Sequence, residues 1–314
     1  MAGQSTIAGT APRVRGRQRL SQRAQEELWA YLFISPWVIG FLIFTFGAMA
    51  FSLVLSFLNT DLLDTTKFIG FTNYVNLAHD PLFWNALRVT VIYTVLSVPF
   101  GTAIALVIAV LLNQKIRPLG FWRTVYYLPA LVSGVAVAVL WGWVLDPDYG
   151  LLNSALGFFG LPQPRWLLSE FWVIPGIAMI ALWGAGANML LYLAGLQGIP
   201  SQLNEAARID GASGWRVFTR ITIPLLTPTI FFNFLLNMIG SFQVFTTNYV
   251  LTQGGPNNAS TTLVLFLYTK AFAQFHFGYA SAVAWILFAI ILCFTLVVFR
   301  SSNRWVYYEG GLRQ

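Results

Sequence analysis

The stretch EAARIDGASGWRVFTRITIP, residues 205–224, carries two acidic residues and three arginines between two long apolar runs. Charge is scarce in the rest of the chain. Of the 314 residues, 9% are charged and 57% are hydrophobic, whereas about 25% of a soluble domain is charged. A soluble core of this size cannot bury that much apolar surface. The charged stretch is therefore interpreted as a loop between two membrane-spanning helices.

Six apolar runs are long enough to cross the hydrocarbon layer of a bilayer, which takes about 20 helical residues. We predict an all-α polytopic membrane protein with a basic N-terminal tail (1–27), a transmembrane domain (28–300) and a C-terminal tail (301–314). The N-terminal tail is followed by an uncleaved first helix, because the apolar run exceeds the 7–15 residues of a signal peptide. The predicted spans are 30–57, 86–112, 124–145, 172–197, 225–250 and 278–299.

The basic residues are unevenly distributed between the two sides of these spans. Because cytoplasmic loops are enriched in lysine and arginine, the richer side is predicted to be cytoplasmic, with both termini on it. The other side carries Lys67, Arg88, Arg165 and Lys270. The richer side carries Arg13, Arg15, Arg17, Arg19, Arg23, Lys115, Arg117, Arg123, Arg208, Arg216, Arg220, Arg300, Arg304 and Arg313.

The composition also excludes several kinds of bond and partner. Cys293 is the single cysteine, so an intrachain disulfide and a thiolate metal cluster are both excluded. The net charge of +7 comes from the loops that face the cytoplasm in this topology, and we expect no nucleic-acid partner. We also expect no metal site on this chain.

The fifth predicted span has uncharged polar residues among aromatic ones. Asn237, Ser241 and Phe245 recur at i, i+4 and i+8, which places them on one face of a continuous helix. Amides and hydroxyls donate and accept hydrogen bonds, and these residue types suit a neutral, hydroxyl-rich solute. The alternative is that they bond between helices. The predicted solute-binding set is Asn237, Ser241, Gln243 and Phe245, with Ser281 and Trp285 of the sixth span opposite.

The charged stretch itself predicts two short helices on the membrane surface within a loop at 200–223. The first begins near Ser201, a permitted N-cap residue, and ends at Gly211 as a left-handed C′ residue. Ser213 caps the second, which ends before Pro224 opens the fifth span. An apolar patch on the first helix is suited to a cytoplasmic partner and consists of Leu203, Ala206, Ala207 and Ile209.

This stretch resembles the EAA loop of permease subunits in binding-protein-dependent ABC importers. The pattern is EAA, three residues, G, nine residues, I, one residue, an aliphatic residue and P, with Ile223 as the aliphatic residue. Four further segments are similar to the MalF-type permeases of carbohydrate importers. They are FWRTVYYLP (121–129), GLLN (150–153), YVLTQGGP (249–256) and FGYASA (277–282).

The resemblance implies a permease that works with other chains. These are a second permease, two cytoplasmic ATPases that bind ATP and Mg, and an extracytoplasmic solute-binding protein that delivers a sugar. This sequence has no Walker motif, so ATP hydrolysis is expected on the separate ATPases. The residues implied to transmit their motion are Glu205, Ala206, Ala207, Asp210 and Gly211.

Two other classes of function are weighed against this one. A secondary transporter is expected to show inverted repeats and an intramembrane ion site, and we find neither. A membrane enzyme needs a nucleophile and base or a metal constellation, but His79 and His276 lie near the outer surface and no acidic residue lies inside a predicted span. A transporter subunit for a polyol or glycerol phosphate remains an alternative to one for a neutral sugar.

Overall fold

The computed structural model describes residues 22–63, 66–114 and 117–307. Most of the predicted N-terminal tail and the end of the predicted C-terminal tail lie outside these residues. The chain divides into two compact units, Met1–Ser52 and Leu53–Gln314, which are described separately.

The described part of the first unit is helical. It consists of α1 (Gln22–Gly40), the π-helical turns η1 (Phe41–Gly47) and the beginning of α2 (Ala48–Ser56). Its large apolar side chains are exposed, with Phe33 at 77% and Phe44 at 80%. The helix from Glu26 to Ser56 is long and apolar enough to cross a membrane, so this exposure suits contact with lipid.

The second unit begins with a small hairpin that the sequence analysis did not predict. Strands β1 (Leu58–Thr60) and β2 (Thr66–Phe68) pair antiparallel. The hairpin is followed by helix α3 (Thr72–His79). Asn73 Nδ2 donates to the carbonyl oxygens of Ser56 and Leu58, at 2.9 Å each. This buried amide holds α3 against the chain that leads into the hairpin.

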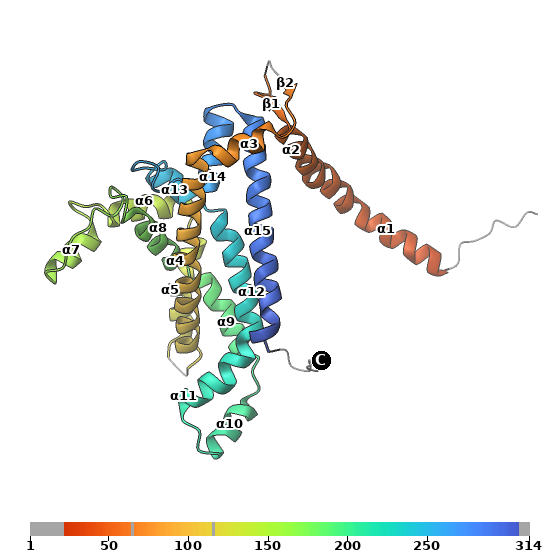
Figure 1. The fold of residues 1–314 in the computed structure, drawn as a ribbon. Helices are drawn as coiled ribbons and strands as arrows, with labels where there is room; N and C mark the ends of the chain where they lie inside the picture. The colour runs from red at the N-terminus through yellow and green to blue at the C-terminus, as the bar shows by residue number, and fades with distance from the viewer. Residues whose placement is uncertain (1–21, 64–65, 115–116, 308–314) are drawn as a thin grey trace, which may run out of the picture. The chain divides into compact units, whose positions relative to one another are not determined.

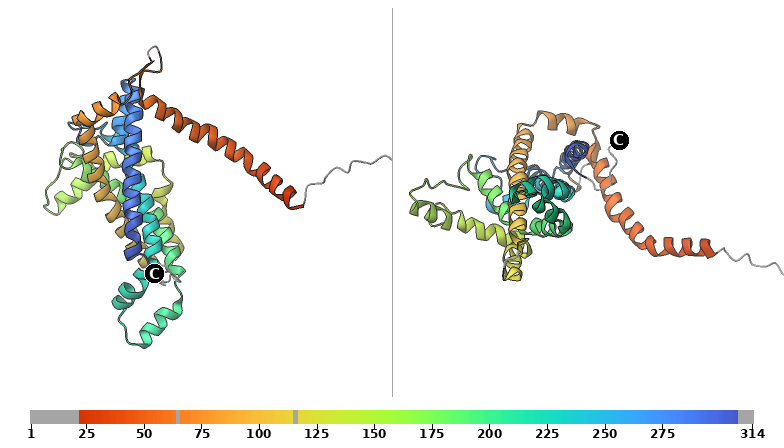
Figure 2. Two further views of the ribbon diagram at one scale, coloured as in Figure 1. Left: turned by 45° about the vertical axis from the view of Figure 1, so that its right-hand side comes forward. Right: turned by 90° about the horizontal axis from the view of Figure 1, so that it is seen from below.

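Three long helices form the centre of the second unit (Figures 1 and 2). They are α4 (Pro81–Leu112), α12 (Ile223–Phe242) and α15 (Phe277–Trp305). The helices α10 (Ser201–Ile209) and α11 (Gly214–Val217) lie beyond one end of this bundle, and α3 lies at the other (Figure 1). The remaining elements are α5 (Leu119–Leu131), α6 (Gly134–Val144), α7 (Leu151–Phe158), α8 (Val173–Trp183), α9 (Gly186–Gln197), η2 (Phe218–Thr222), α13 (Thr246–Leu251), α14 (Leu263–Tyr268) and η3 (Thr269–Ala273).

The described residues contain four helices that are long and apolar enough to span a membrane, and two bent pairs. The four helices are Glu26–Ser56, Pro81–Leu112, Gly214–Leu251 and Phe277–Trp305, and they coincide with four predicted spans. The predicted spans at 124–145 and 172–197 are each broken instead. Helices α5 and α6 meet at 100°, and α8 and α9 meet at 48°. The number of spans is six if each bent pair crosses once.

Both breaks occur where the sequence weakens the helix. The break between α5 and α6 falls at Val132 and Ser133, next to Gly134, and valine, serine and glycine all form helix less readily than alanine or leucine. The break between α8 and α9 falls at Gly184 and Ala185, next to Gly186. Glycine is a poor helix former, so the chain bends there at low cost. A run of apolar residues does not by itself reveal either bend.

Gly186 also permits a close approach between two helices. A Cβ atom at this position would collide with the backbone carbonyl of Tyr126 in α5. Small residues allow this kind of backbone contact between helices in lipid, where no hydrophobic force drives association. The described residues form three buried apolar clusters in this unit, and the largest joins α3, α4, α12, α14 and α15.

We expect Gly186→Ala to destabilise the protein by about 1–3 kcal/mol, since the added methyl group must displace backbone. The matched control is Gly240→Ala, because a Cβ at this helical glycine meets nothing within 4 Å. Thermal unfolding of the purified protein in detergent compares the two variants. An unchanged melting temperature for Gly186→Ala contradicts the close packing of α5 and α9.

Candidate functional site

A cavity of about 270 Å³ lies between α4, the junction of α8 and α9, and α12, with polar and apolar residues in its lining. We call it the Asn237 cavity. Its lining includes Gly101, Gly184 and Gly240, which have no side chains and so leave room between the helices. The polar residues that line it are Tyr93, Ser97, Thr102, Asn188, Asn237 and Ser241.

Two amides that line this cavity bond to each other. Asn188 Nδ2 donates to Asn237 Oδ1 at 3.0 Å, joining α9 to α12. The other half of each amide, Asn188 Oδ1 and Asn237 Nδ2, has no partner among the described residues. The pair therefore keeps one acceptor and one donor for a solute. A hydroxyl group can bond to either, because it both donates and accepts hydrogen bonds.

Ser241 is held more firmly than Asn237. Its side chain is 8% exposed, and its Oγ lies 3.0 Å from Thr94 Oγ1 and 2.8 Å from the carbonyl oxygen of Met238. The first of these bonds joins α12 to α4, and the second lies within α12. Ser241 lines the cavity from the side, and part of its hydrogen-bonding capacity is already used within the bundle.

The predicted stripe of Asn237, Ser241 and Phe245 is wrong at its third member. Helix α12 ends at Phe242, and the next helix begins at Thr246, so the i+8 position is not on the same face. Phe245 packs instead against Tyr249 and Tyr268, with ring centroids 5.2 and 4.9 Å away. Gln243 is exposed and does not line the cavity.

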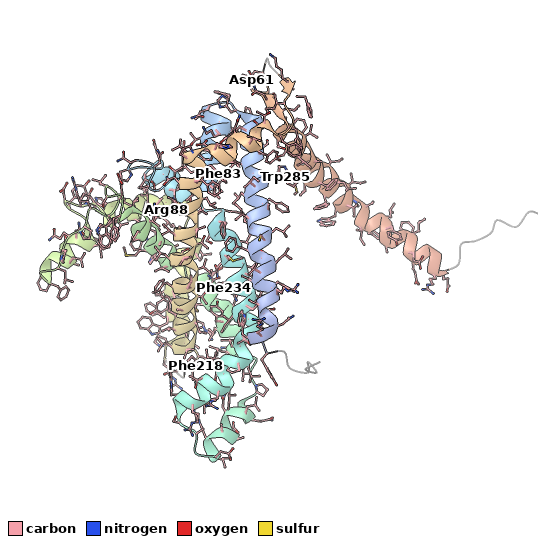
Figure 3. All side chains as sticks on the ribbon, in the orientation of Figure 1. Asp61, Phe83, Arg88, Phe218, Phe234 and Trp285 are labelled. Atoms are coloured by element: carbon pink, nitrogen blue, oxygen red, sulfur yellow. The ribbon has the colours of Figure 1, made fainter. Side chains whose placement is uncertain are left out.

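The two residues predicted on the sixth span also lie away from the cavity. Ser281 and Trp285 belong to α15 and are not among the lining residues. Trp285 packs against Phe288 of its own helix, with ring centroids 5.6 Å apart. Figure 3 shows Trp285 on α15 and Phe234 on the adjacent α12. Of the six predicted residues, the structure brings Asn237 and Ser241 to one cavity.

Sequence reasoning missed the residues that face Asn237 and Ser241. Tyr93, Ser97 and Gly101 lie on one face of α4 at i, i+4 and i+8, and Asn188 lies on α9. The sequence carried a signal both for Asn188 and for the α4 residues. Asn188 is an amide within an apolar run, and the α4 residues are polar or small at helical spacing, which is costly in lipid without a partner or a function.

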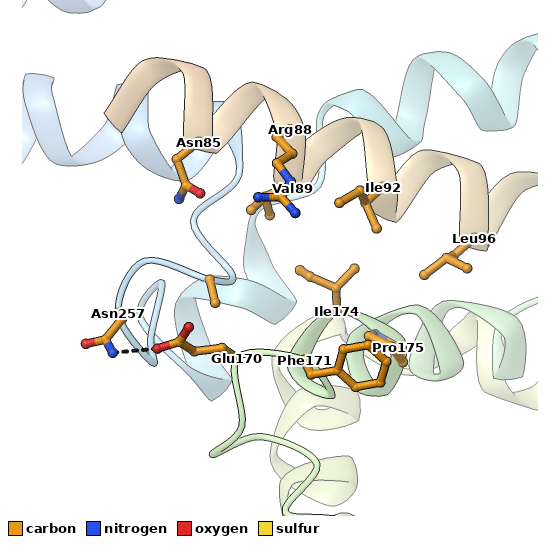
Figure 4. A pocket seen from close by; sticks show the side chains of 11 residues that line it. Asn85, Arg88, Val89, Ile92, Leu96, Glu170, Phe171, Ile174, Pro175 and Asn257 are labelled. Atoms are coloured by element: carbon orange, nitrogen blue, oxygen red, sulfur yellow. Dashed lines mark hydrogen bonds between the residues drawn. The ribbon is translucent and has the colours of Figure 1, made fainter. Parts of the chain in front are cut away.

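A second cavity of about 580 Å³ lies beside the first turns of α4 (Figure 4). We call it the Arg88 cavity. Asn85 and Arg88 line it from α4, and Glu170 and Phe171 line it from the chain that precedes α8. Asn257 Nδ2 donates to Glu170 Oε1 at 2.6 Å across one edge. The sequence analysis assigned no role to these residues.

The charged stretch forms a projecting helix and the first turns of a long one (Figure 1). Helix α10 begins at Ser201, but Pro200 is its N-cap residue and supplies no side-chain bond. Gly211 has φ of +76°. Its N–H donates to Arg208 O and the N–H of Ala212 donates to Ala207 O, at 3.1 and 2.9 Å. This pair of bonds is a Schellman motif, and it confirms Gly211 as the C′ residue.

The predicted second short helix is not separate from the fifth span. Ser213 caps it as predicted, since its Oγ accepts the N–H of Arg216 at 3.4 Å. Helix then continues without a break from Gly214 through η2 to Phe242. Pro224 lies inside this run without ending it, directly after the π-helical turns of η2, where the regular i to i−4 bonding is already changed. The side chains of Glu205, Ala206 and Asp210 on α10 or its end are exposed, and Ala207 is half-buried.

Comparison with known families finds one match over most of the chain. Residues 83–306 match the family described as binding-protein-dependent transport system inner membrane component. The matched region contains both cavities and the charged stretch.

Two relatives align with most of the chain. The lactose transport system permease protein LacF of Rhizobium radiobacter is 36% identical over 91% of this chain and 97% of its own length. The sn-glycerol-3-phosphate transport system permease protein UgpA of Agrobacterium fabrum is 33% identical over 88% of this chain and 96% of its own length.

A solved structure has the same fold. It is a bacterial alginate ABC transporter in complex with an alginate pentasaccharide-bound periplasmic protein. One of its chains superimposes with a TM-score of 0.79 at 26% identity, covering 91% of this chain and 98% of that one.

We expect Gly211→Ala to loosen the end of α10, because a left-handed conformation costs a residue with a Cβ about 1–2 kcal/mol. The amide hydrogens of residues 211 and 212 should exchange roughly 5- to 30-fold faster. Gly214→Ala is the control, since Gly214 is helical and its Cβ position is open. Hydrogen-exchange mass spectrometry of residues 206–214 measures both. Equal protection in the two variants contradicts the Schellman assignment.

Proposed function

The chain belongs to the family of binding-protein-dependent transport system inner membrane components, and from this premise we propose that it forms half of the pathway of an ATP-driven importer for a neutral di- or oligosaccharide. It is a multi-pass membrane subunit of a transporter and not an enzyme, like the permeases to which it aligns. The observation that carries the proposal is the uncharged polar lining of the Asn237 cavity.

The lining favours a neutral, hydroxyl-rich solute. The six polar side chains that line the cavity are amides and hydroxyls. The amide pair of Asn188 and Asn237 keeps a free acceptor and a free donor. Each can bond a sugar hydroxyl, and a polar group buried with its partner is more favourable than one buried alone. Lactose transport by a relative that is 36% identical supports the same class.

A phosphorylated solute is the second candidate, because one relative transports sn-glycerol 3-phosphate. Phosphate is held in proteins mainly by arginine or lysine. The residues that line the Asn237 cavity include neither. The neutral sugar therefore fits this cavity better than a phosphate ester does, and a neutral polyol fits it by the same chemistry.

The remaining parts of the importer are proposed on other chains. A second permease completes the pathway, two ATPases bind ATP and Mg on the cytoplasmic side, and a solute-binding protein delivers the sugar from outside. The alginate transporter with its bound periplasmic protein supports this assembly. The excess of arginine and lysine in the tails and in the charged stretch supports cytoplasmic termini in the cell membrane.

The charged stretch is proposed to transmit the motion of the ATPases. Glu205 is exposed on α10 and free to pair with a basic residue of an ATPase groove. Gly211 fixes the turn between α10 and the long helix that starts at Gly214. That helix continues to Phe242 and carries Asn237 and Ser241. A force on α10 would therefore reach the cavity through one continuous helix.

We expect Glu205→Ala to uncouple transport from ATP hydrolysis without unfolding the chain. Loss of a charge-assisted hydrogen bond costs about 1.5–3 kcal/mol, so uptake should fall by roughly tenfold or more. Gln202→Ala, also on the exposed surface of α10, is the control. The measurement is sugar uptake and binding-protein-stimulated ATPase activity of the reconstituted complex. If the Glu205→Ala complex assembles normally and keeps full uptake, the Glu205 carboxylate does not transmit motion from the ATPases.

We expect Asn237→Ala and Ser241→Ala to reduce sugar uptake while ATPase stimulation by the loaded binding protein is retained. Losing a bond to a buried sugar hydroxyl costs roughly 1–3 kcal/mol. Gln243→Ala is the matched amide control, because Gln243 is exposed outside the cavity. Thermal unfolding of each variant separates loss of binding from loss of packing. Unchanged uptake in both cavity variants would move the solute site elsewhere.

A further inference from the structure

The Arg88 cavity has more than twice the volume of the Asn237 cavity, about 580 against about 270 Å³. Figure 4 shows Arg88 reaching into it from α4, with Glu170 and Asn257 on the opposite side. A cavity of this size accommodates a sugar of one or two rings, since small-molecule sites measure about 300–1,000 Å³.

Several polar groups that line this cavity lack hydrogen-bond partners among the described residues. The Arg88 guanidinium makes no hydrogen bond or ion pair with the described residues, although Glu170 lines the same cavity. Glu170 Oε1 accepts from Asn257, which leaves its second oxygen open. Asn85 Nδ2 donates to Asn258 O at 2.8 Å, which leaves its Oδ1 open. The cavity therefore presents free donors on Arg88 and free acceptors on Asn85 beside it and on Glu170 opposite.

The rest of the lining is apolar and includes an aromatic ring. Val89 and Ile174 form part of the wall, and the side chain of Phe171 is 75% exposed at its edge. A sugar ring has hydroxyls that both donate and accept, together with an apolar face that can lie against an aromatic ring. A simple anion would use the guanidinium but would be repelled by Glu170. The combination suits a carbohydrate better than a small anion.

The two cavities border the same apolar cluster. Val89 and Ile174 line the Arg88 cavity, and Tyr93 lines the Asn237 cavity. All three belong to one buried cluster that also contains Ile177 and Ala178. Successive turns of α4 therefore lead from one cavity to the other past a layer of apolar side chains.

We propose that the Arg88 cavity is a second carbohydrate site, in which Arg88 and Glu170 bind sugar hydroxyls before the solute passes the apolar cluster to the Asn237 cavity. This inference rests on the proposed function in one respect, that the solute is a carbohydrate. It is separate from the role of Asn237, because the two sites share no residue. Arg88 supplies several hydrogen-bond donors, and Glu170 supplies the acceptor.

The test is photoaffinity labelling of the assembled complex in lipid nanodiscs with two neutral probes, diazirine-tagged lactose and a diazirine-tagged neutral trisaccharide. Labelled residues are located by mass spectrometry. We expect labelling of residues 170–175 at the Arg88 cavity and of residues 233–244 at the Asn237 cavity. Arg88→Gln should lower labelling of 170–175 roughly tenfold, as expected for the loss of a charge-assisted hydrogen bond, and leave 233–244 unchanged.

Arg165→Gln is the matched control, since it removes the same charge from an exposed arginine that does not line the cavity. Glu170→Gln is a second variant in case Arg88→Gln does not assemble, and it should also reduce labelling of 170–175. Absence of labelling at 170–175 with both probes overturns the proposal, as does equal labelling in Arg88→Gln and Arg165→Gln. Labelling of 170–175 without 233–244 supports the second site and instead contradicts the proposed role of Asn237.

Discussion

Two buried hydroxyls on α4 fix the positions of the helices around it. Thr90 Oγ1 accepts the N–H of Leu263 at 2.9 Å, which attaches the first turn of α14 to α4. One turn later, Thr94 Oγ1 lies 3.0 Å from Ser241 Oγ of α12. In lipid an unpaired polar group is costly and apolar contact alone gives little specificity. These bonds therefore set the register in which α4, α12 and α14 meet, and both cavities lie along the helix that they hold.

The sequence predicted the transmembrane helices well because a long apolar run has few alternatives in a membrane. It could not predict where a run would bend. The breaks fall at Val132–Ser133 and before Gly186, and the close approach of Gly186 to Tyr126 is a tertiary contact that an apolar run does not reveal. The hairpin at Leu58–Phe68 was missed for a similar reason, since two strands of three residues carry little periodic signal.

The charged stretch was more predictable than the cavity because its structure is local. Gly211 ends α10 through bonds to residues within one turn, and a local motif can be recognised from spacing alone. The cavity required partners that are distant in sequence. Asn188 and Asn237 are 49 residues apart, and the end of α12 at Phe242 removed Phe245 from the expected face. The expected spacing assumed one continuous helix through Phe245, whereas α12 ends at Phe242.

The base of the long helix is also attached to the chain that follows α15. Pro228 has no N–H, so the carbonyl of Pro224 loses its usual helical partner. Thr227 Oγ1 donates to that carbonyl at 2.6 Å and accepts the N–H of Tyr307 at 2.9 Å. One hydroxyl thus bonds the carbonyl that Pro228 leaves without a helical partner. The same hydroxyl attaches the chain that follows α15 to α12. This joint lies between the charged stretch and the Asn237 cavity, so the chain after α15 is attached to the same long helix that links them.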